Sequence, residues 1–377
     1  MVFENPERPP DSSVAIVAVT RHGTNLALQL QAGLPGSECF VPVRHRFAIA
    51  MGARGFTRIG DLLPRIWQEF GAIVCIMAAG IVVRQIAPLL HHKASDPAVV
   101  VMDEQGRFVI SLLSGHLGGA NALAEKVARL TGGQSVVTTA SEVQNKPALD
   151  LMALKAGLEI ENIDMISRVA RSLLEDERIW IYDPEGRLKP YLIGEMNISW
   201  LEAPEVQGCH SVWRALDERL SMLATGDEAT AGVWVSECIV PRTLSCLLLR
   251  PRNLVVGVGC NRGTAVEEVY GLILSVFERE RLSLLSIRNL ASVDLKSGEP
   301  GILEVGRLLG RPVHFFPRQE IENIIVPSPS SVVMRHIGVP NVCEATALLS
   351  ARKGKLIVVK QKTANVTLAV ARVNSPS

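Results

Sequence analysis

The sequence lacks the charge imbalance and the long apolar runs that mark several classes of protein. Its 39 Lys and Arg residues are balanced by 38 Asp and Glu residues, which leaves a formal net charge of +1. This balance excludes a protein that works mainly through a strong overall field, such as a non-specific nucleic-acid binder. The longest apolar stretch, Phe70–Val83, is shorter than the roughly 20 residues that a membrane-spanning helix needs. We therefore expect neither a nucleic-acid nor a membrane partner.

Cysteine patterns typical of disulfide-rich or zinc-binding proteins are also missing. The seven cysteines are widely scattered and include no C-x-x-C pair. This spacing disfavours a disulfide framework and a structural zinc site. The N-terminal residues show no basic region followed by an apolar one, so we expect no secretory signal. These features predict a protein of the reducing cytoplasm.

Apolar residues are plentiful enough for more than one buried core. They make up 47% of the 377 residues, and a domain typically contains roughly 100 to 200 residues. Residues 151–250 carry ten basic and sixteen acidic side chains (−6), whereas residues 251–377 carry sixteen and ten (+6). Such asymmetry favours separate domains. We predict domains at residues 1–139, 140–250 and 251–377.

The first domain alternates short β-branched runs with helical patterns. Strands are expected at Val14–Val19, Cys39–Val43, Ile73–Met77 and Ala98–Met102, and helices at Asn25–Gln31, at Ile59–Phe70 and from Leu117 onward. Repeated strand, turn and helix predict a mainly parallel sheet with helices on its faces.

The two later domains differ in regularity. The central one holds four of the five tryptophans, and its short elements at 149–156, 163–174 and 179–182 indicate an irregular α+β region without a catalytic pattern. The C-terminal one begins with the apolar strand Leu254–Gly259, and Thr264 with Glu267 forms the pattern of a helix capping box. Further strands are expected at 356–359 and 366–370. The fold class is therefore multi-domain α/β.

A first glycine-bearing loop lies in MAAGIVVRQIAP. Gly80 is placed where the strand Ile73–Met77 passes into a helix, and Arg84 follows one turn later. Amides at such a helix start attract anions, and Arg84 can clamp a carboxylate. The alternative is that Gly80 permits a tight turn and that Arg84 pairs with a nearby acid.

A second loop, SLLSGHLGGAN, is richer in candidate residues. Ser114 is a candidate helix cap, and Gly115, Gly118 and Gly119 allow a ligand to approach the backbone. His116 stands at this mouth, where an imidazole can exchange a proton near neutral pH. The alternative is a structural histidine, which is the commoner role of a single histidine.

An acidic pair, Asp103 and Glu104, ends the strand before this loop. Either carboxylate can orient a histidine or activate water. The alternative, a plain hairpin turn before Gly106, fits Asp103 better than Glu104. We therefore choose Glu104 as the partner of His116.

The third loop, GVGCNRGT, contains glycines at 257, 259 and 263. A dinucleotide site should also show an acidic residue at the end of the second strand, but Arg288 and Asn289 follow Leu284–Ile287. An anion site that uses Arg262 and the helix amides fits better. Cys260 is interpreted as a packed thiol rather than a nucleophile.

The loop His91–Lys93 combines two histidines with a lysine ahead of Asp96 and Pro97. Adjacent histidines point in different directions on most backbones, so a metal site built from this pair is disfavoured. We interpret the loop as a positive patch and predict no metal ligands on the protein.

Together these segments resemble the CbiG family of cobalamin biosynthesis, the cobalt-precorrin-5A hydrolases. One block runs from Cys75 through GIVVRQIAPLL, KASDPAVVVMDEQGRFVISLLSGHLGGAN and VVTTASEV, near Val143. A C-terminal block resembles the family's CobE-like domain, with VGVGCNRGT, LASVDLKSGEPGI, PSPSSVV, VCEATALL and LIVVKQKTANVTLAVAR. The family's usual threonine-aspartate-valine-asparagine stretch appears here as SEVQN, residues 141–145, and Asn261 stands where a basic residue is expected.

The resemblance implies a cytoplasmic enzyme of the anaerobic corrin pathway that hydrolyses a carbon–carbon bond. Its substrate is a methylated cobalt tetrapyrrole whose ring A acetate forms a δ-lactone to carbon C20. The enzyme opens the lactone and releases C20 with its methyl group as acetaldehyde. Cobalt arrives with the substrate, so no further cofactor is implied.

On this reading His116 is the general acid/base and Glu104 assists it. Loop amides around Ser114–Gly119 are the expected oxyanion donors. The residues expected to bind the carboxylate-rich substrate are Gly80, Arg84, Lys93, Ser114, Gly115, Gly118, Gly119, Asn121, Gly259, Arg262 and Gly263.

Two alternatives stay open. One is a non-catalytic tetrapyrrole carrier that uses the same basic clamps, and the other is a nucleotide-dependent enzyme that uses the third loop. Substrate hand-over to other enzymes of the pathway and a homo-oligomeric state are further expectations.

Overall fold

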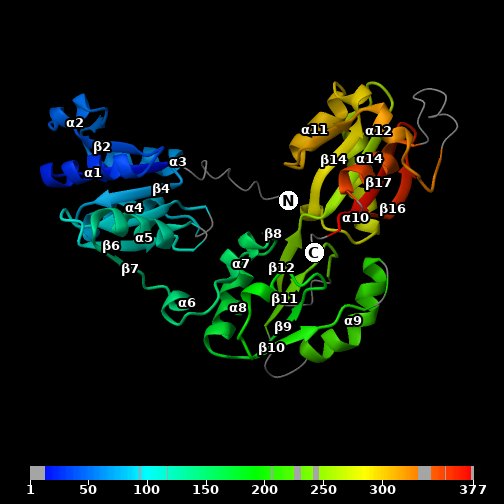
Figure 1. The fold of residues 1–377 in the computed structure, drawn as a ribbon, viewed down its shortest axis with the longest axis horizontal. Helices are drawn as coiled ribbons and strands as arrows, with labels where there is room; N and C mark the ends of the chain where they lie inside the picture. Colours follow the sequence, from blue (N-terminus) through cyan, green and yellow to red (C-terminus); the bar gives the residue numbers. More distant parts are fainter. Residues whose placement is uncertain are drawn as a thin grey trace. The chain divides into compact units, whose positions relative to one another are not determined.

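The computed structural model describes residues 13–92, 95–116, 118–204, 206, 208–224, 231–240, 246–329, 341–352 and 354–374. The chain divides into two compact units, Met1–Leu151 and Met152–Ser377 (Figure 1). The first unit contains one sheet and the second contains two. In the described residues, no helix is both long and apolar enough to cross a membrane.

The first unit is built on a seven-stranded sheet in the order β3-β2-β1-β4-β5-β6-β7. The first five strands in this order are parallel, β6 is antiparallel to β5, and β7 is parallel to β6. The carboxyl ends of β1–β5 therefore lie at one edge, and those of β6 and β7 lie at the opposite edge. The strands are β1 (Val14–Ala18), β2 (Glu38–Pro42), β3 (Arg54–Phe56), β4 (Ala72–Ile76), β5 (Ala98–Met102), β6 (Phe108–Leu113) and β7 (Gln134–Val136).

Helices cover both faces of this sheet. The apolar sides of the helices on each face pack against the sheet and form one core there, so the unit's described residues form two cores. On one face pack α1 (Arg21–Gly33), α2 (Arg46–Ala50) and α5 (Ala120–Thr131). On the other pack α3 (Ile59–Glu69), α4 (Ala79–Ile86) and the 3-10 turn η1 (Ala87–Leu89). Two short helices end the unit, α6 (Ala140–Val143) and α7 (Leu149–Lys155), the second of which continues into the second unit.

The middle sheet corrects the expectation of an irregular central region. Its order is β10-β9-β11-β12-β8, and only β8 is antiparallel to its neighbour. The strands are β8 (Leu158–Ile160), β9 (Ile179–Tyr182), β10 (Ile198–Leu201), β11 (Gly232–Val235) and β12 (Cys246–Pro251), with α8 (Met165–Leu174), η2 (Lys189–Tyr191) and α9 (Cys209–Ala224). Because the strands are only three to six residues long, their periodicity is too brief to predict strands of this sheet other than β9.

The last sheet has the order β15-β14-β13-β17-β16. Helices α10 and α11 pack on one face, and α12 and α14 on the other. The elements are β13 (Leu254–Cys260), α10 (Val266–Arg279), η3 (Leu284–Ser286), β14 (Ile287–Val293), η4 (Asp294–Lys296), α11 (Pro300–Leu308), β15 (Val313–Phe316), α12 (Arg318–Glu322), α14 (Val342–Ala351), β16 (Lys355–Lys362) and β17 (Val366–Arg372). The mixed α/β class predicted from the sequence is confirmed. The predicted domain boundaries stay predictions, although each sheet falls within one predicted domain except for Pro251, the last residue of β12.

Two local predictions in this last domain are wrong. Thr264 does not cap α10, because its hydroxyl donates to the carbonyl of Asn261 and the helix has no side-chain cap. Arg288 and Asn289 do not end the second strand but lie inside β14, where both side chains bond to Ser350. The residue that follows β14 is Asp294, so the expectation that no acidic residue ends the second strand is wrong.

Candidate active site

His116 lies in the loop between β6 and α5, at the carboxyl edge of β6. The loop folds back on itself, because the amides of Ala120 and Asn121 donate to the carbonyls of Ser114 and Gly115. Gly118 is required for this close approach, since a Cβ there would lie 2.2 Å from the Cβ of Ser114. The folded loop therefore presents the imidazole at the edge of the sheet.

A serine reaches His116 from the next loop along the sheet. Because β6 and β7 are adjacent parallel strands joined by α5, the segments that follow them meet at one edge. The second residue of α6 is Ser141, and its Oγ lies 3.1 Å from Nε2 of His116. The sheet pairing thus brings together two side chains that are 25 positions apart.

The other imidazole nitrogen faces a carboxylate. Nδ1 of His116 lies 3.5 Å from Oδ1 of Asp150, in the first turn of α7, and the two side chains are 18% and 13% exposed. Burial alone would raise the pKa of Asp150, but the hydrogen bond and charge of His116 and the amide of Leu151 hold it below its usual value. Asp150 is therefore an anion that favours a proton on Nδ1, which makes Nε2 the acceptor nitrogen that faces Ser141.

The buried Asn121 braces this arrangement. Its Oδ1 accepts a 2.7 Å hydrogen bond from Ser111 in β6, and its Nδ2 lies 3.4 Å from the Thr139 hydroxyl, two residues before Ser141. A Cβ on Gly115 would lie 2.7 Å from the same Oδ1, which explains the glycine there. Contact of Asn121 with a substrate stays a prediction.

The role expected for Ser114 as a helix cap is wrong. Its φ is 56°, its hydroxyl donates to the carbonyl of Asp96 at 3.1 Å, and the cap residue of α5 is Gly119, with a φ of 84°. The Gly119 amide donates to the His116 carbonyl. The amides of Gly119, Ala120 and Asn121 are thus used inside the loop rather than offered to an oxyanion.

The pairing of Glu104 with His116 is also wrong. Glu104 follows β5 at the opposite edge of the sheet, where its Oε2 accepts a 2.5 Å hydrogen bond from the hydroxyl of Thr20, the N-cap of α1. The six-residue strand β6 separates the two loops, which corresponds to roughly 20 Å. Asp150 is the acidic partner that Glu104 was predicted to be.

Gly80 and Arg84 belong to the same edge as Glu104. Both are exposed in α4, and Nη1 of Arg84 donates to the Gly80 carbonyl at 3.2 Å. The structure therefore does not bring them to His116. Their role in substrate binding stays a prediction.

Asp103 forms the hairpin turn between β5 and β6, as its alternative reading predicted. Its carboxylate accepts hydrogen bonds of 2.8 Å from the amides of Gln105 and Phe108. Burial raises the pKa of Asp103, but these amides outweigh that effect and lower it overall. Lys93 lies outside the described residues.

The third loop is in contact with a carboxylate from another part of the last domain. The buried Glu299 accepts a hydrogen bond of 2.5 Å from the Gly263 amide, and its other oxygen lies 3.5 Å from Nζ of Lys296. The expected anion site at the start of α10 is thus occupied by the protein's own carboxylate. Gly259 approaches Thr367, and Arg262 is exposed in the second unit. Burial raises the pKa of the Cys260 thiol, which supports its reading as a packed thiol.

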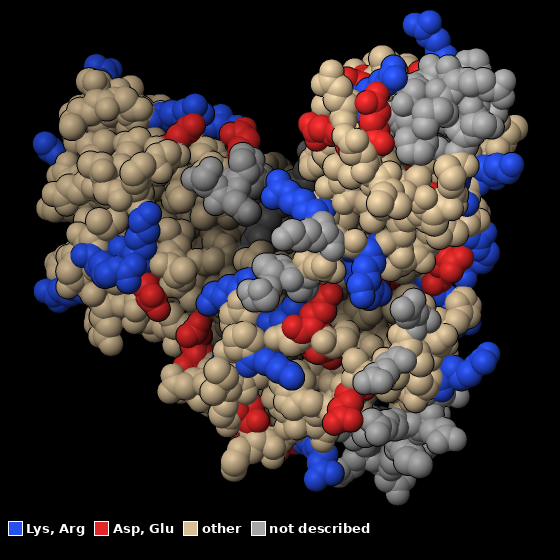
Figure 2. Space-filling view, turned by 45° about the vertical axis from the view of Figure 1, so that its right-hand side comes forward, with Lys and Arg blue, Asp and Glu red and all other residues tan. Residues whose placement is uncertain are grey.

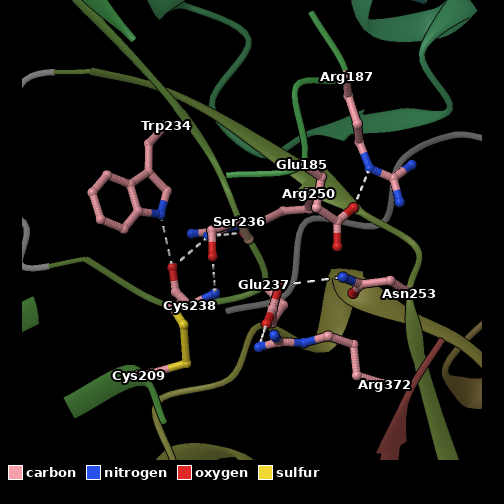
Figure 3. A network of polar contacts seen from close by, with 10 residues as sticks. All are labelled: Glu185, Arg187, Cys209, Trp234, Ser236, Glu237, Cys238, Arg250, Asn253 and Arg372. Atoms are coloured by element: carbon pink, nitrogen blue, oxygen red, sulfur yellow. Dashed lines mark hydrogen bonds and ion pairs between the residues drawn. A yellow bond between two sulfur atoms is a disulfide. The ribbon is translucent and has the colours of Figure 1, made fainter. Parts of the chain in front are cut away.

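The second unit has a cavity of about 420 Å³ at the carboxyl ends of β9 and β11. Figure 3 shows the polar network beside it, in which Arg250 donates to the carbonyls of Ser236 and Cys238, and Glu237 pairs with Arg372. Cys238 forms a disulfide with Cys209, the first residue of α9. The scattered cysteine spacing did not predict this bond, because the folded chain brings the end of β11 to the start of α9. Among the described residues, no site residue predicted from the sequence lines this cavity.

Charged side chains of both signs are spread over the face drawn in Figure 2, with uncharged areas between them. This distribution agrees with the net charge of +1. Recognition of an anionic ligand on this face would therefore depend on local contacts rather than on a broad field.

Comparisons with known proteins decide the family. Models described as Cobalamin synthesis G N-terminal, Cobalamin biosynthesis central region and Cobalamin synthesis G C-terminus match residues 61–142, 147–251 and 254–371. The chain belongs to the CbiG family. The resemblance found in the sequence is thereby confirmed.

The relatives of this CbiG chain include curated proteins of nearly the same length. It is 32% identical to the "Cobalt-precorrin-5A hydrolase" of Priestia megaterium, over 95% of this chain and 94% of the relative. It is 30% identical to the protein of that name from Salmonella typhimurium strain LT2, over 95% and 98%. Its C-terminal part is 34% identical to "Protein CobE" of a Sinorhizobium species, over 32% of this chain and 79% of the relative.

Sequence reasoning found His116 in this CbiG chain but missed Asp150 and the role of Ser141. A prediction of two parallel strands before and after α5 would have indicated these partners, because such pairing brings the segments after β6 and β7 together. Neither strand was predicted, so Ser141 was noted only as a departure from the family pattern.

Proposed function

We propose that this protein is a cobalt-precorrin-5A hydrolase that opens the ring A δ-lactone of its substrate and releases the two-carbon fragment as acetaldehyde. The observation that carries the proposal is the placement of His116 between a hydroxyl and a carboxylate. Similarity to the curated relatives over nearly the whole chain supports the choice of substrate.

In this proposal His116 moves the protons of lactone opening. Nε2 accepts a proton from the attacking oxygen and returns it to the oxygen that leaves the carbonyl carbon. Asp150 holds Nδ1 protonated and stabilises the imidazolium that forms transiently. The freed C20 alcohol then loses its proton, and its carbon–carbon bond to the macrocycle breaks. The electron pair stays on the macrocycle carbon, which is protonated, and acetaldehyde departs.

The proposal includes several properties expected from the sequence. The reaction belongs to the hydrolysis of carbon–carbon bonds, cobalt arrives with the substrate, and the protein acts in the cytoplasm. Arg84, Lys93 and Arg262 are proposed as clamps for substrate carboxylates. A homo-oligomeric state and hand-over to other pathway enzymes complete the proposal.

The test compares acetaldehyde release from cobalt-precorrin-5A by wild type and His116→Ala. We expect a fall of about 10³-fold in kcat, because a positioned acid/base contributes roughly 10² to 10⁴. The control is His314→Ala, an exposed histidine of the second unit, which should retain wild-type rates. Wild-type rates in His116→Ala would refute the assignment of His116. Stoichiometric binding of the corrinoid by wild type without acetaldehyde would instead support the carrier alternative.

A further inference from the structure

We propose that Ser141 is a nucleophile, whose Oγ attacks an ester carbonyl and forms a covalent acyl-enzyme before water completes the hydrolysis. The choice of the lactone as the ester rests on the proposed function. The nucleophile itself is inferred from the geometry around His116 alone.

The first support is the order of the three side chains. A hydroxyl, an imidazole and a carboxylate stand in sequence, with 3.1 Å between Oγ of Ser141 and Nε2 of His116, and 3.5 Å between Nδ1 and Oδ1 of Asp150. A nucleophilic hydroxyl needs this set, since it is a weak nucleophile until an oriented base accepts its proton. The same roles recur on unrelated folds and are recognised by geometry.

The second support is accessibility. Ser141 is half-buried, and the His116 side chain keeps 18% of its surface exposed, so a substrate carbonyl can approach the pair. The hydroxyls of two nearby serines have other partners, since Ser111 donates to Asn121 and Ser114 donates to the Asp96 carbonyl. Those two hydroxyls hold the loop together, whereas the Ser141 hydroxyl contacts the base.

A second hydroxyl–imidazole pair in the same unit provides an internal comparison. Thr24 Oγ1 lies 2.8 Å from Nδ1 of His45, but both residues are buried and the Thr24 hydroxyl also lies within donating distance of the Thr20 carbonyl. Neither property suits a nucleophile. Thr24 should therefore stay unreactive under conditions that modify Ser141.

The covalent steps balance without an additional reactant. Oγ of Ser141 bonds to the lactone carbonyl carbon while its proton moves to Nε2 of His116. The bond between that carbon and the ring oxygen breaks, and the oxygen takes the proton from Nε2. Water then attacks the Ser141 ester with His116 as base, the carbon–Oγ bond breaks, and Oγ regains its proton. The products are the free acetate side chain and unmodified Ser141.

The decisive experiment uses the full-length protein and a fluorophosphonate, a reagent that phosphonylates activated serine hydroxyls with loss of fluoride. We expect intact-protein mass to show one adduct, and peptide mapping to place it on Ser141 and not on Thr24. An unmodified Ser141, or an adduct only elsewhere, overturns the proposal. The measurement requires neither the cobalt substrate nor a variant.

Variants then test the dependence on the neighbouring groups. His116→Ala should lower the labelling rate of Ser141 at least about 10²-fold, and Asp150→Asn at least about tenfold, because the base is lost or loses its orientation. Ser297→Ala, an exposed serine of the second unit, is the control and should label as wild type. Equal labelling in wild type and His116→Ala contradicts activation by the imidazole.

Turnover separates this proposal from the proposed function. Rapid acid quenching with cobalt-precorrin-5A should capture a Ser141 adduct of the substrate mass, and Ser141→Ala should lower kcat at least about 10²-fold. Labelling of Ser141 without acetaldehyde release would sink the proposed function and keep the nucleophile. Acetaldehyde release by Ser141→Ala at wild-type rate would sink the nucleophile and keep the function.

Discussion

Two polar clusters of this protein are built in opposite ways. The cluster around His116 comes from one loop and two short helices at a sheet edge. Its three side chains are partly exposed, and its imidazole has partners on both nitrogens. The network around Arg250 follows the ends of buried strands, and the Arg250 side chain is 0% exposed. Both are hydrogen-bonded, yet only the first contains a group that can exchange protons near neutral pH.

The difference shows what each cluster stabilises. Arg250 donates to the carbonyls of Ser236 and Cys238, so it holds the segment that carries the disulfide. The Glu237 carbonyl in this segment also accepts a hydrogen bond from the Ser283 amide. The His116 side chain instead contacts two other side chains, those of Ser141 and Asp150. Substitutions in the first unit's cluster should therefore change rates, and those in the Arg250 network should change stability.

The largest effect is expected for Arg250→Met. It removes the donor of the buried Ser236 carbonyl and one donor of the Cys238 carbonyl, which keeps its hydrogen bond from Trp234 Nε1. It also removes the partner of Glu161, so the free energy of unfolding should fall by about 3 to 5 kcal/mol. Urea denaturation followed by tryptophan fluorescence measures it well, because four of the five tryptophans lie between residues 152 and 250.

The matched control is Arg252→Met, whose pair with Glu159 is half exposed and should be worth less than about 1 kcal/mol. Equal losses in the two variants would show that the Arg250 network is not the support inferred here. A fall in acetaldehyde release per folded Arg250→Met molecule would erase the distinction between the clusters.

A smaller loss is expected when the Cys209–Cys238 disulfide is absent. The cysteines are 29 positions apart, and closing a loop of that length stabilises a fold by about 3.6 kcal/mol. A phosphine reductant should lower the free energy of unfolding by that amount, and the Cys209→Ser/Cys238→Ser double variant should already be lower and insensitive to reductant. Cys260→Ser, which changes a free thiol, should remain sensitive. If the free energy of unfolding of the wild type did not change with the reductant, the Cys209–Cys238 bond would not be stabilising.

The sequence predicted elements well where apolar runs are continuous and bounded by turn residues. The bounds of β5 and β9 are those predicted, and α3 differs from its prediction by one residue. The second strand of the last domain was predicted at Leu284–Ile287 but is Ile287–Val293 (β14). Arg288 and Asn289 interrupt the apolar run, and tertiary hydrogen bonds to Ser350 allow them inside the strand. Local pattern cannot reveal a partner 61 positions away.

The same limit applies to the site. His116 was recognisable from the glycines around it, because the local backbone needs them. Glu104 was chosen for its closeness along the chain, but antiparallel pairing of β5 with β6 sends it to the other edge of the sheet. Asp150 and Ser141 reach His116 only through the parallel pairing of β6 with β7 and the packing that follows it. Those contacts depend on the strand order of the sheet, which could not be predicted because β6 and β7 were not recognised in the sequence.

The smallest effect concerns Asp183, at the cavity of the second unit. One carboxylate oxygen accepts a 2.8 Å hydrogen bond from the Leu188 amide, whereas Oδ1 is buried and has no hydrogen-bond partner among the described residues. Burial raises the pKa of Asp183 despite the amides of Leu188 and Arg187. A folded-state pKa above the unfolded value means that stability declines as pH rises from about 4 through the folded pKa. Ionised Asp183 therefore destabilises the fold at neutral pH.

Asp183→Asn should consequently raise the free energy of unfolding at pH 7 by about 1 kcal/mol, and the gain should vanish near pH 3, where the wild-type carboxyl is also neutral. Urea denaturation at both pH values measures this difference, with the exposed Asp294→Asn as a control that should change it by less than about 0.5 kcal/mol. A loss of stability at pH 7 would mean that ionised Asp183 has a stabilising partner in the cavity. The comparison would then fail, because the second unit too would contain a charged group positioned for a ligand.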